Sequence, residues 1–369
     1  MKRKGEMSMT LISIQNIYPG MVLKEDVYSR LGGLLYKKGT ILKEQDQEIL
    51  FAFGVTHIQI IDEKKDKEKM KISRNTKKEE EIHNQSNSQE LIFQENYNRA
   101  FYLVAQILRS AQGKPQIPLI ELRNSIQPIL DYTIKNPKVL LTLHRFENLN
   151  KYEIVHALSV GMLSYSIANW LGMDQSKWTQ LALAGVLHDI GMSRIPNQIL
   201  DKKTSLDYYE REEVKKHTVY GYQMLKGIKG LNEGAILAVL QHHERNDGSG
   251  YPLQLKQEQI HTYSKIIAIA DVFHAMISKR SYRERIPIFS VLEQLLEDSF
   301  GKLDPKIVQT FVRMLSQITI GKRVILNNGL EGTILFISAN HPTRPLIQVN
   351  DQIINLETET NLFVKEIIV

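Results

Sequence analysis

The sequence predicts a multidomain chain in which a central all-α domain is flanked by small β-rich N- and C-terminal modules. Residues 91–317 carry long apolar patterns with the helical period. Residues 1–62 and 318–369 instead hold short apolar stretches separated by turn residues, which are typical of strands. Residues 63–90 are charged and polar. A length of 369 residues accommodates two or three domains.

The N-terminal module, residues 1–62, is expected to contain short strands and one helix. Its apolar stretches MVL, LGGLLY and HIQIID are separated by turns, and Gly32-Gly33 lies between two strand candidates, as in a hairpin. Residues 45–53 predict a short helix that ends near Gly54.

The next segment, residues 63–90, is predicted to be a charged linker or a solvated helix. Residues 62–81 contain 15 charged residues of mixed sign, and the polar stretch HNQSNSQE follows. Such a composition cannot build a core of its own, so a spacer is the simplest interpretation.

The central domain, residues 91–317, is predicted to be entirely helical. LIFQENYNRAFYLVAQILRSAQG and YEIVHALSVGMLSYSIANWLG both have amphipathic patterns, and the second ends at Gly172. WTQLALAGVLHDIG and LNEGAILAVLQHH are more apolar, which favours inner helices. Asp207 and Glu210 predict a capping box for the helix that carries His217.

The C-terminal module, residues 318–369, is predicted to return to β-structure. IGKRVILNNGLEGTILFIS holds two strands around the hairpin signal Asn327-Asn328-Gly329. PLIQV, IINL and FVKEIIV predict further short strands.

Composition excludes several classes of protein. The chain has no cysteine, which excludes disulfides, thiolate zinc sites and iron–sulfur clusters. The net charge of +6 is too small to indicate a duplex nucleic-acid partner, although it suits a small phosphorylated ligand. No apolar run is long enough to span a membrane. We therefore expect a cytoplasmic protein.

Histidines and aspartates gather in the central domain. Seven of the eleven histidines lie between residues 156 and 274. A single histidine is most often a satisfied core or surface residue, but each unsatisfied polar group in a bundle would cost roughly 2–7 kcal/mol. A shared metal is the economical explanation, since helical bundles build metal sites from inward-facing side chains. Five expected helices contribute His156, His188, Asp189, His217, His242, His243 and Asp271.

Adjacent pairs within this set favour two ions rather than one. Neighbouring residues of a helix point about 100° apart, so one member of a pair can face each ion. Asp189 can bridge both through its two oxygens. Imidazole and carboxylate ligands suit iron, manganese, zinc or nickel. A pair of such ions clamps an in-line displacement at phosphorus and supplies a hydroxide at neutral pH.

These residues resemble a known family. His156, HDIG at 188–191, His217, HHERNDGSGYP at 242–252 and IIAIADVF at 266–273 are similar to the HD-GYP domain, a subclass of the HD superfamily of metal-dependent phosphohydrolases. The likeness covers residues 150–315 and includes IPNQILDKK at 195–203 and RSYRER at 280–285. The ordered set of motifs is far more specific than an isolated His-Asp pair.

The resemblance implies an HD-type helical bundle that hydrolyses the bacterial messenger cyclic di-GMP to pGpG or GMP. It implies divalent transition-metal ions, with iron or manganese favoured over zinc or nickel. It implies two of them rather than three, because Tyr152 stands where some members carry a third-metal glutamate. The implied catalytic residues are Asp189, as the bridge, and His188. The implied metal ligands are His156, His188, Asp189, His217, His242, His243 and Asp271, and the implied substrate-binding residues are Arg280, Arg283, Tyr251 and Gly250.

Two departures from the family pattern keep alternatives open. Met192 stands where the family often has a lysine near a substrate phosphate, with Arg194 close by in sequence, and His274 stands where it often has a second aspartate. One alternative is a cyclic-di-GMP sensor with negligible turnover. Another is a hydrolase of a different cyclic dinucleotide. The resemblance also leaves open a homodimer and a protein partner that binds through the GYP loop or the β-rich modules.

Overall fold

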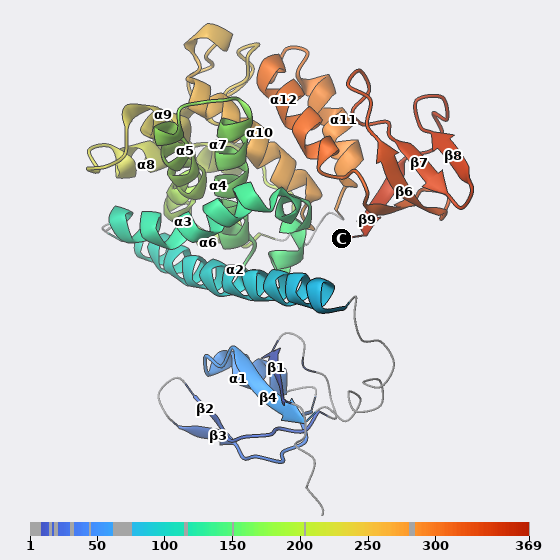
Figure 1. Cartoon of the computed structure of the whole chain (residues 1–369). Coiled ribbons are helices and arrows are strands. Elements are labelled where there is room, and N and C mark those ends of the chain that lie inside the picture. The colour runs from blue at the N-terminus through green and yellow to red at the C-terminus, as the bar shows by residue number, and fades with distance from the viewer. Residues whose placement is uncertain are drawn as a thin grey trace, which may run out of the picture. The chain divides into compact units, whose positions relative to one another are not determined.

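The computed structural model describes residues 9–14, 17, 21–29, 33–43, 46–61, 76–113, 117–149, 151–202, 204–279 and 285–368. The chain divides into two compact units, Met1–Asn87 and Ser88–Val369. Helices make up most of the second unit and strands occur towards both ends of the chain (Figure 1), which confirms the predicted helical middle with β-structure at its flanks.

The first unit is small and contains two antiparallel strand pairs. Buried Leu23, Leu42 and Leu50 form the centre of its core. The Tyr36 hydroxyl donates a 2.9 Å hydrogen bond to Asp46 at the start of the helix. The hairpin predicted at Gly32-Gly33 is confirmed, although Gly32 itself lies outside the described residues. The elements are β1 (Met9–Ser13) paired with β4 (His57–Ile61), β2 (Val27–Tyr28) paired with β3 (Leu34–Tyr36), and α1 (Asp46–Ala52).

The second unit is built mainly from helices. Helix α2 begins at Thr76, before the division at Ser88, so helix occupies part of the segment expected to be a linker or solvated helix. The helices are α2 (Thr76–Ser110), α3 (Leu119–Lys135), α4 (Tyr152–Trp170), α5 (Gln175–Leu187), α6 (Asn197–Leu200), α7 (Tyr208–Lys215), α8 (His217–Leu225), α9 (Glu233–Gln241), α10 (Thr262–Ile277), α11 (Ile288–Asp298) and α12 (Pro305–Gln317), with 3₁₀ helices η2 (Pro137–Leu149), η3 (Ile190–Arg194) and η4 (Gln257–Gln259).

Helix α4 is the central helix of this unit. Every residue from Ile154 to Ala168 is buried, so the amphipathic pattern expected for this segment is wrong. The reason is that α3, α5, α10 and α12 all pack against α4 and leave it no solvent face. The crossing with α5 is close because glycines meet there: a Cβ on Gly185 would lie 2.9 Å from the Cα of Gly161.

The predicted capping box is present, but it caps a different helix from the one expected. The Asp207 carboxylate accepts from the Glu210 amide at 2.9 Å, and the Glu210 carboxylate accepts from the Asp207 amide at 2.8 Å. The helix they begin, α7, ends at Lys215, and His217 starts the separate helix α8. A turn residue, Lys216, separates the two helices, so the prediction that the capped helix carries His217 is wrong.

The C-terminal strands form one antiparallel sheet that packs against α11 (Figure 1). The predicted hairpin around Gly329 is confirmed. Val324, Ile334 and Ile347 belong to the same buried core as the helices. The sheet order is β8 (Gln352–Asn355), β7 (Leu346–Val349), β6 (Glu331–Phe336), β5 (Arg323–Leu326) and β9 (Val364–Ile368).

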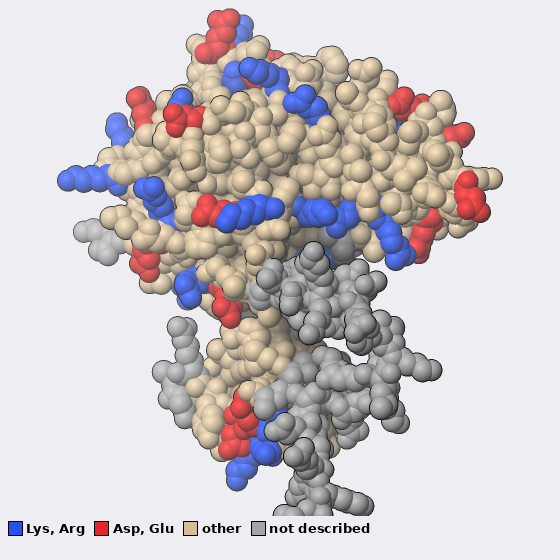
Figure 2. All heavy atoms as spheres, viewed as in Figure 1, with Lys and Arg blue, Asp and Glu red and all other residues tan. Residues whose placement is uncertain are grey.

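The charge of the surface bears on nucleic-acid binding, and the length and hydropathy of the helices bear on membrane insertion. One face of the second unit carries a short row of Lys and Arg side chains among scattered acidic ones, rather than a continuous basic surface (Figure 2). Within the described part of the chain, no helix combines the length and the hydropathy that crossing a membrane requires.

Candidate metal centre

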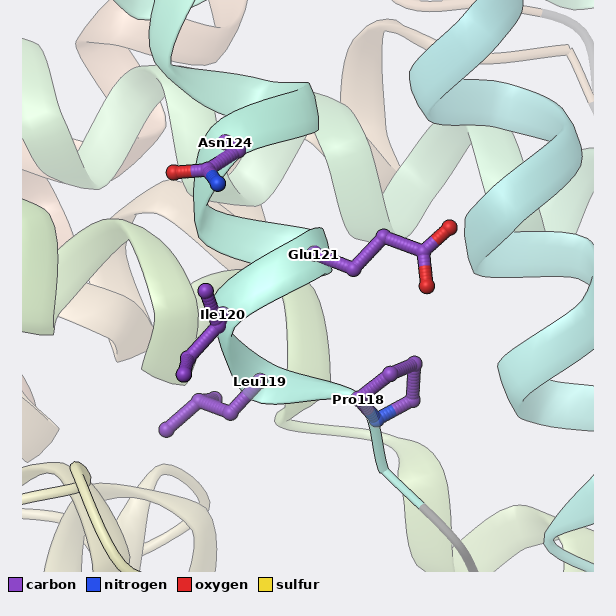
Figure 3. Close-up of a pocket in the computed structure, with 5 residues that line it drawn as sticks. All are labelled: Pro118, Leu119, Ile120, Glu121 and Asn124. Carbon is purple, nitrogen blue, oxygen red and sulfur yellow. The ribbon is translucent and has the colours of Figure 1, made fainter.

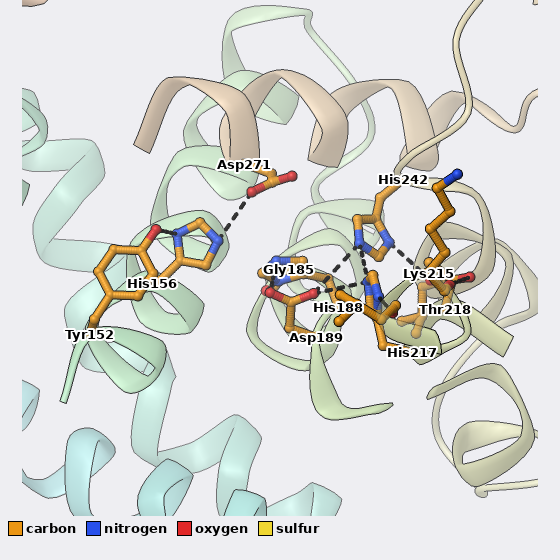
Figure 4. Close-up of polar contacts among 12 residues, drawn as sticks. Tyr152, His156, Gly185, His188, Asp189, Lys215, His217, Thr218, His242 and Asp271 are labelled. Carbon is orange, nitrogen blue, oxygen red and sulfur yellow. Dashed lines mark hydrogen bonds and ion pairs between the residues drawn. The ribbon is translucent and has the colours of Figure 1, made fainter. Parts of the chain in front are cut away.

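Five helical segments bring the seven predicted ligands together, and Figure 4 labels all of them except His243. Helix α4 supplies His156 and α10 supplies Asp271. His188 caps the C-terminus of α5, and Asp189 follows it directly. His217 is the first residue of α8, while His242 and His243 follow the end of α9. The helices are therefore arranged so that their ends, more than their faces, meet at the cluster.

Asp189 lies between two groups of possible ligands. Its Oδ1 atom is 3.2 Å from His217 Nε2 and 3.7 Å from His242 Nε2. Its other oxygen, Oδ2, is 3.2 Å from His188 Nε2. Potential ligand atoms of Asp189, His217, His242 and His243 all lie within 4.8 Å of one another, and so do those of His156, His188 and Asp189. One carboxylate is thus shared by two groups, each of suitable size for one ion.

Three of the histidines are oriented by carbonyls near the C-terminal ends of helices: α5 for His188, α7 for His217 and α9 for His242. The Nδ1 atom lies 2.7 Å from the Gly185 carbonyl in His188, 2.7 Å from the Val214 carbonyl in His217 and 2.9 Å from the Val239 carbonyl in His242. The last carbonyls of a helix lack intrahelical partners, so each Nδ1–H donates to one of them. Each Nε2 then faces Asp189, and in the neutral ring it keeps the lone pair that a metal needs, which is how metal-ligating histidines are commonly held.

His156 and Asp271 complete the second group. His156 Nε2 is 3.1 Å from Asp271 Oδ1. The His156 ring centroid lies 5.1 Å from that of His188, across the close α4–α5 crossing. His156 therefore faces the part of the cluster that contains His188 and Asp189.

Electrostatics keep the carboxylates charged and two of the imidazoles neutral. Burial alone would raise the pKa of Asp189, but the surrounding histidines outweigh it and hold this pKa well below its usual value. The pKa of Asp271 is likewise lowered by His156 and other histidines, against the effect of burial. Burial lowers the pKa of His242 and His243. His188 is different. Burial lowers its pKa, but the nearby carboxylates of Asp189 and Asp271 have the larger, opposite effect, and the pKa rises from 6.5 to about 9.

The donor set fits divalent transition-metal ions. His188 Nε2 is buried and has no hydrogen-bond partner among the described residues, although it lies beside Asp189. A buried ring nitrogen in that position costs free energy unless a ligand satisfies it. Neutral imidazoles and carboxylates are the ligands that iron, manganese, zinc and nickel accept. The cluster could therefore hold metal.

The loop after His243 is tied to the cluster by Glu244. This buried carboxylate accepts backbone hydrogen bonds from Leu253 at 2.7 Å and Leu255 at 2.9 Å. A Cβ on Gly250 would collide with the backbone of Glu244 and Arg245, so only glycine allows this approach. The result is that the Tyr251 ring stacks on His243, with centroids 4.7 Å apart.

The predicted substrate-binding residues are only partly brought to the cluster. Tyr251 and Gly250 lie beside His243, whereas Arg280 and Arg283 lie outside the described residues. Arg194 donates a 2.7 Å hydrogen bond to the Gly113 carbonyl, which draws its guanidinium to the loop after α2.

The sequence interpretation missed two residues near the cluster. The sequence interpretation gives Glu244 no role beyond its place in the HHE motif. Its position directly after two predicted metal ligands was the signal that could have indicated a role near the cluster. Lys215 was not singled out at all. Its ammonium lies 5.6 Å from the Tyr251 ring centroid, and no sequence pattern indicates that proximity.

A separate hollow lies at the start of α3. Its volume is about 430 Å³, and it is lined by Pro118, Leu119, Ile120, Glu121 and Asn124 (Figure 3). It shares no residue with the cluster and offers a single titratable side chain, Glu121. It is therefore no rival to the cluster as a reaction site.

Comparison with known proteins identifies an HD domain around the cluster. An HD domain model matches residues 138–307, which include all seven clustered residues. A cyclic di-GMP phosphodiesterase of Pseudomonas aeruginosa is 30% identical over 238 residues, 64% of this chain and 57% of the relative. A 3′3′-cGAMP-specific phosphodiesterase of Vibrio cholerae is 35% identical over 155 residues, 42% of this chain and 30% of the relative.

Among solved structures, Bd1817, an HDG"Y"P protein from Bdellovibrio bacteriovorus, aligns with a TM-score of 0.49 at 18% identity, over 84% of this chain and 99% of that one. The chain spans about half the length of several curated relatives that it matches. The stretch of the chain that matches the HD domain thus contains the whole cluster, and within it the Glu244 loop joins the HHE and GYP motifs.

Proposed function

We propose that this protein is a metal-dependent phosphodiesterase that hydrolyses cyclic di-GMP to pGpG, GMP or both. The observation that carries the proposal is the position of Asp189, whose two oxygens face two separate groups of imidazole nitrogens. This arrangement suits two ions that share one carboxylate, and two-ion sites are widely used for displacement at phosphorus.

The proposed ligands divide between the two positions. One ion would be held by Asp189, His217, His242 and His243, and the other by His156, His188, Asp189 and Asp271. Two divalent ions, with iron or manganese preferred to zinc or nickel, would polarise a phosphodiester oxygen and lower the pKa of the attacking water molecule. Hydrolysis adds this water across a P–O ester bond and leaves a 5′-phosphate and a 3′-hydroxyl.

The chain's own residues would bind and orient the nucleotide. The Tyr251 ring, fixed against His243, offers a face on which a purine can stack. The Lys215 ammonium beside that ring, which also pairs with Glu212, would supply positive charge for a phosphodiester. We retain Arg280 and Arg283 as further phosphate ligands on the strength of the family motif.

Two alternative functions each have a specific observation in their favour. Hydrolysis of a different cyclic dinucleotide is favoured by the V. cholerae relative, whose name specifies 3′3′-cGAMP. Binding without turnover is favoured by Met192, which is uncharged, and by Arg194, which hydrogen-bonds the Gly113 carbonyl. Both keep the same metal centre and differ in substrate or rate.

The test is a direct assay with a matched variant. The protein would be purified anaerobically, its iron, manganese and zinc quantified, and cyclic di-GMP and 3′3′-cGAMP followed by chromatography. We expect two ions per chain and release of pGpG or GMP, with both lost in Asp189→Ala. Faster cleavage of 3′3′-cGAMP would assign the other substrate. Tight binding of intact cyclic di-GMP with no product, restored to turnover by Met192→Lys, would identify a sensor.

A further inference from the structure

His156 is held differently from the other histidines of the cluster. His188, His217 and His242 use carbonyls at helix ends to fix their Nδ1 atoms. His156 lies within α4, where the carbonyl three residues earlier already accepts a helical hydrogen bond. Its Nδ1 atom must therefore be held by side chains.

The side chain closest to this nitrogen belongs to His274. The two Nδ1 atoms are 2.9 Å apart, whereas the Tyr152 hydroxyl is 3.3 Å from His156 Nδ1. His274 is fully buried on α10, three residues after Asp271 and on the same helix face. One face of α10 thus contacts both nitrogens of His156, with Asp271 at Nε2 and His274 at Nδ1.

The short distance between the rings restricts the tautomers. Two imidazole nitrogens can share a hydrogen bond only if one of them carries the proton. If His274 carries it, neutral His156 has its own proton on Nε2, and that atom cannot bind a metal. If His156 carries it on Nδ1, its Nε2 lone pair faces Asp271 and is available to an ion.

We propose that His274 is a positioning residue that accepts the Nδ1–H of His156 and so keeps the His156 Nε2 lone pair available to the ion shared with His188 and Asp189. The inference rests on the proposed metal centre, and it gives a role to the residue that departs from the family pattern. It also predicts that only the ion on the His156 side depends on His274.

The experiment measures Mn²⁺ stoichiometry and affinity for the full chain and three variants. His274→Phe keeps a ring of similar size but removes the acceptor. His274→Asn keeps an acceptor close to the position of Nδ1. Tyr152→Phe removes the other neighbour of His156 Nδ1. We expect His274→Phe to bind one Mn²⁺ normally and the second about 10- to 100-fold more weakly, the usual cost of removing a partner of a metal-ligating histidine. His274→Asn and Tyr152→Phe should retain both ions within a few-fold.

The possible outcomes separate this inference from the proposed function. If the wild-type chain binds no metal, both fail. If it binds two ions and His274→Phe binds them equally well, or Tyr152→Phe causes the larger loss, only the role of His274 is overturned. Should His274→Phe not fold, the comparison of His274→Asn with His274→Gln decides, because glutamine places its amide nearer the position of Nε2. Equal affinities in that pair would overturn the proposal.

Discussion

The phenol ring of Tyr251 stacks on the imidazole of His243, with ring centroids 4.7 Å apart and planes inclined by 27°. The contact joins the glycine-rich loop to the metal cluster, and it leaves Tyr251 half-buried rather than enclosed.

Replacing Tyr251 should weaken nucleotide binding more than metal binding. Stacking of a base on an aromatic ring contributes about 1–3 kcal/mol. Tyr251→Ala should therefore raise the KM for cyclic di-GMP about 10-fold or more, while Tyr251→Phe, which retains the ring, should stay close to wild type. Steady-state kinetics alongside metal analysis check this. A loss of bound metal in Tyr251→Ala would show that the ring serves His243 instead.

Lys215 should contribute to affinity through charge. Its ammonium lies over the Tyr251 ring, so we expect Lys215→Ala to raise the KM several-fold and to make it less sensitive to salt. The neighbouring Lys216 pairs with Glu213 as Lys215 pairs with Glu212, so it is a control matched for the ion pair: Lys216→Ala should change neither quantity. Equal effects of the two substitutions would exclude a specific role for Lys215.

The Glu244 carboxylate should stabilise the loop that carries Tyr251. It accepts two backbone hydrogen bonds from a buried position, and a buried donor or acceptor left without its partner costs about 1–3 kcal/mol. Glu244→Ala should lower the free energy of unfolding by at least that amount and speed proteolysis within residues 245–255. Chemical denaturation and limited proteolysis test this, with Glu258→Ala, an exposed position in η4, expected to behave as wild type.

The glycine crossing of α4 and α5 should be needed to keep His156 near His188. A methyl group on Gly185 would meet the backbone of Gly161, which cannot move without separating the helices. We expect Gly185→Ala to destabilise the fold by about 1–3 kcal/mol, as overpacking usually does, and to reduce metal occupancy. Gly113→Ala meets only ordinary contacts and should be neutral. Unchanged stability in Gly185→Ala would contradict the close crossing.

His144 should make stability depend on pH. Burial, together with Arg285 and Arg145, lowers its pKa from 6.5 to about 4 against an opposing effect of Glu366. The unfolded chain therefore binds this proton first as the pH falls. Stability should be complete above pH 6.5 and decline between pH 6.5 and 4, with a shallower decline in His144→Gln. Thermal unfolding across this range, on metal-free protein, measures the difference.

The sequence by itself determined which residues form the cluster and the kind of segment that carries each one. HDIG, HHE and GYP appear as letters in the chain, and the apolar periods before them predict helices whose ends carry His188 and His242. These features depend on local sequence patterns, so they can be predicted without knowing how the helices pack. The hairpin at Gly329 was predictable for the same reason, because a turn is specified by a few adjacent residues.

Only the tertiary structure decided how the cluster is held. The contact between His156 and His274 joins residues 118 positions apart, and it exists because α10 packs along α4. The burial of α4 on all sides, the approach of Lys215 to Tyr251 and the hydrogen bond from Arg194 to Gly113 also depend on where separate elements meet. Local propensity carries no information about such tertiary contacts, since they are determined by the packing of side chains from distant parts of the chain.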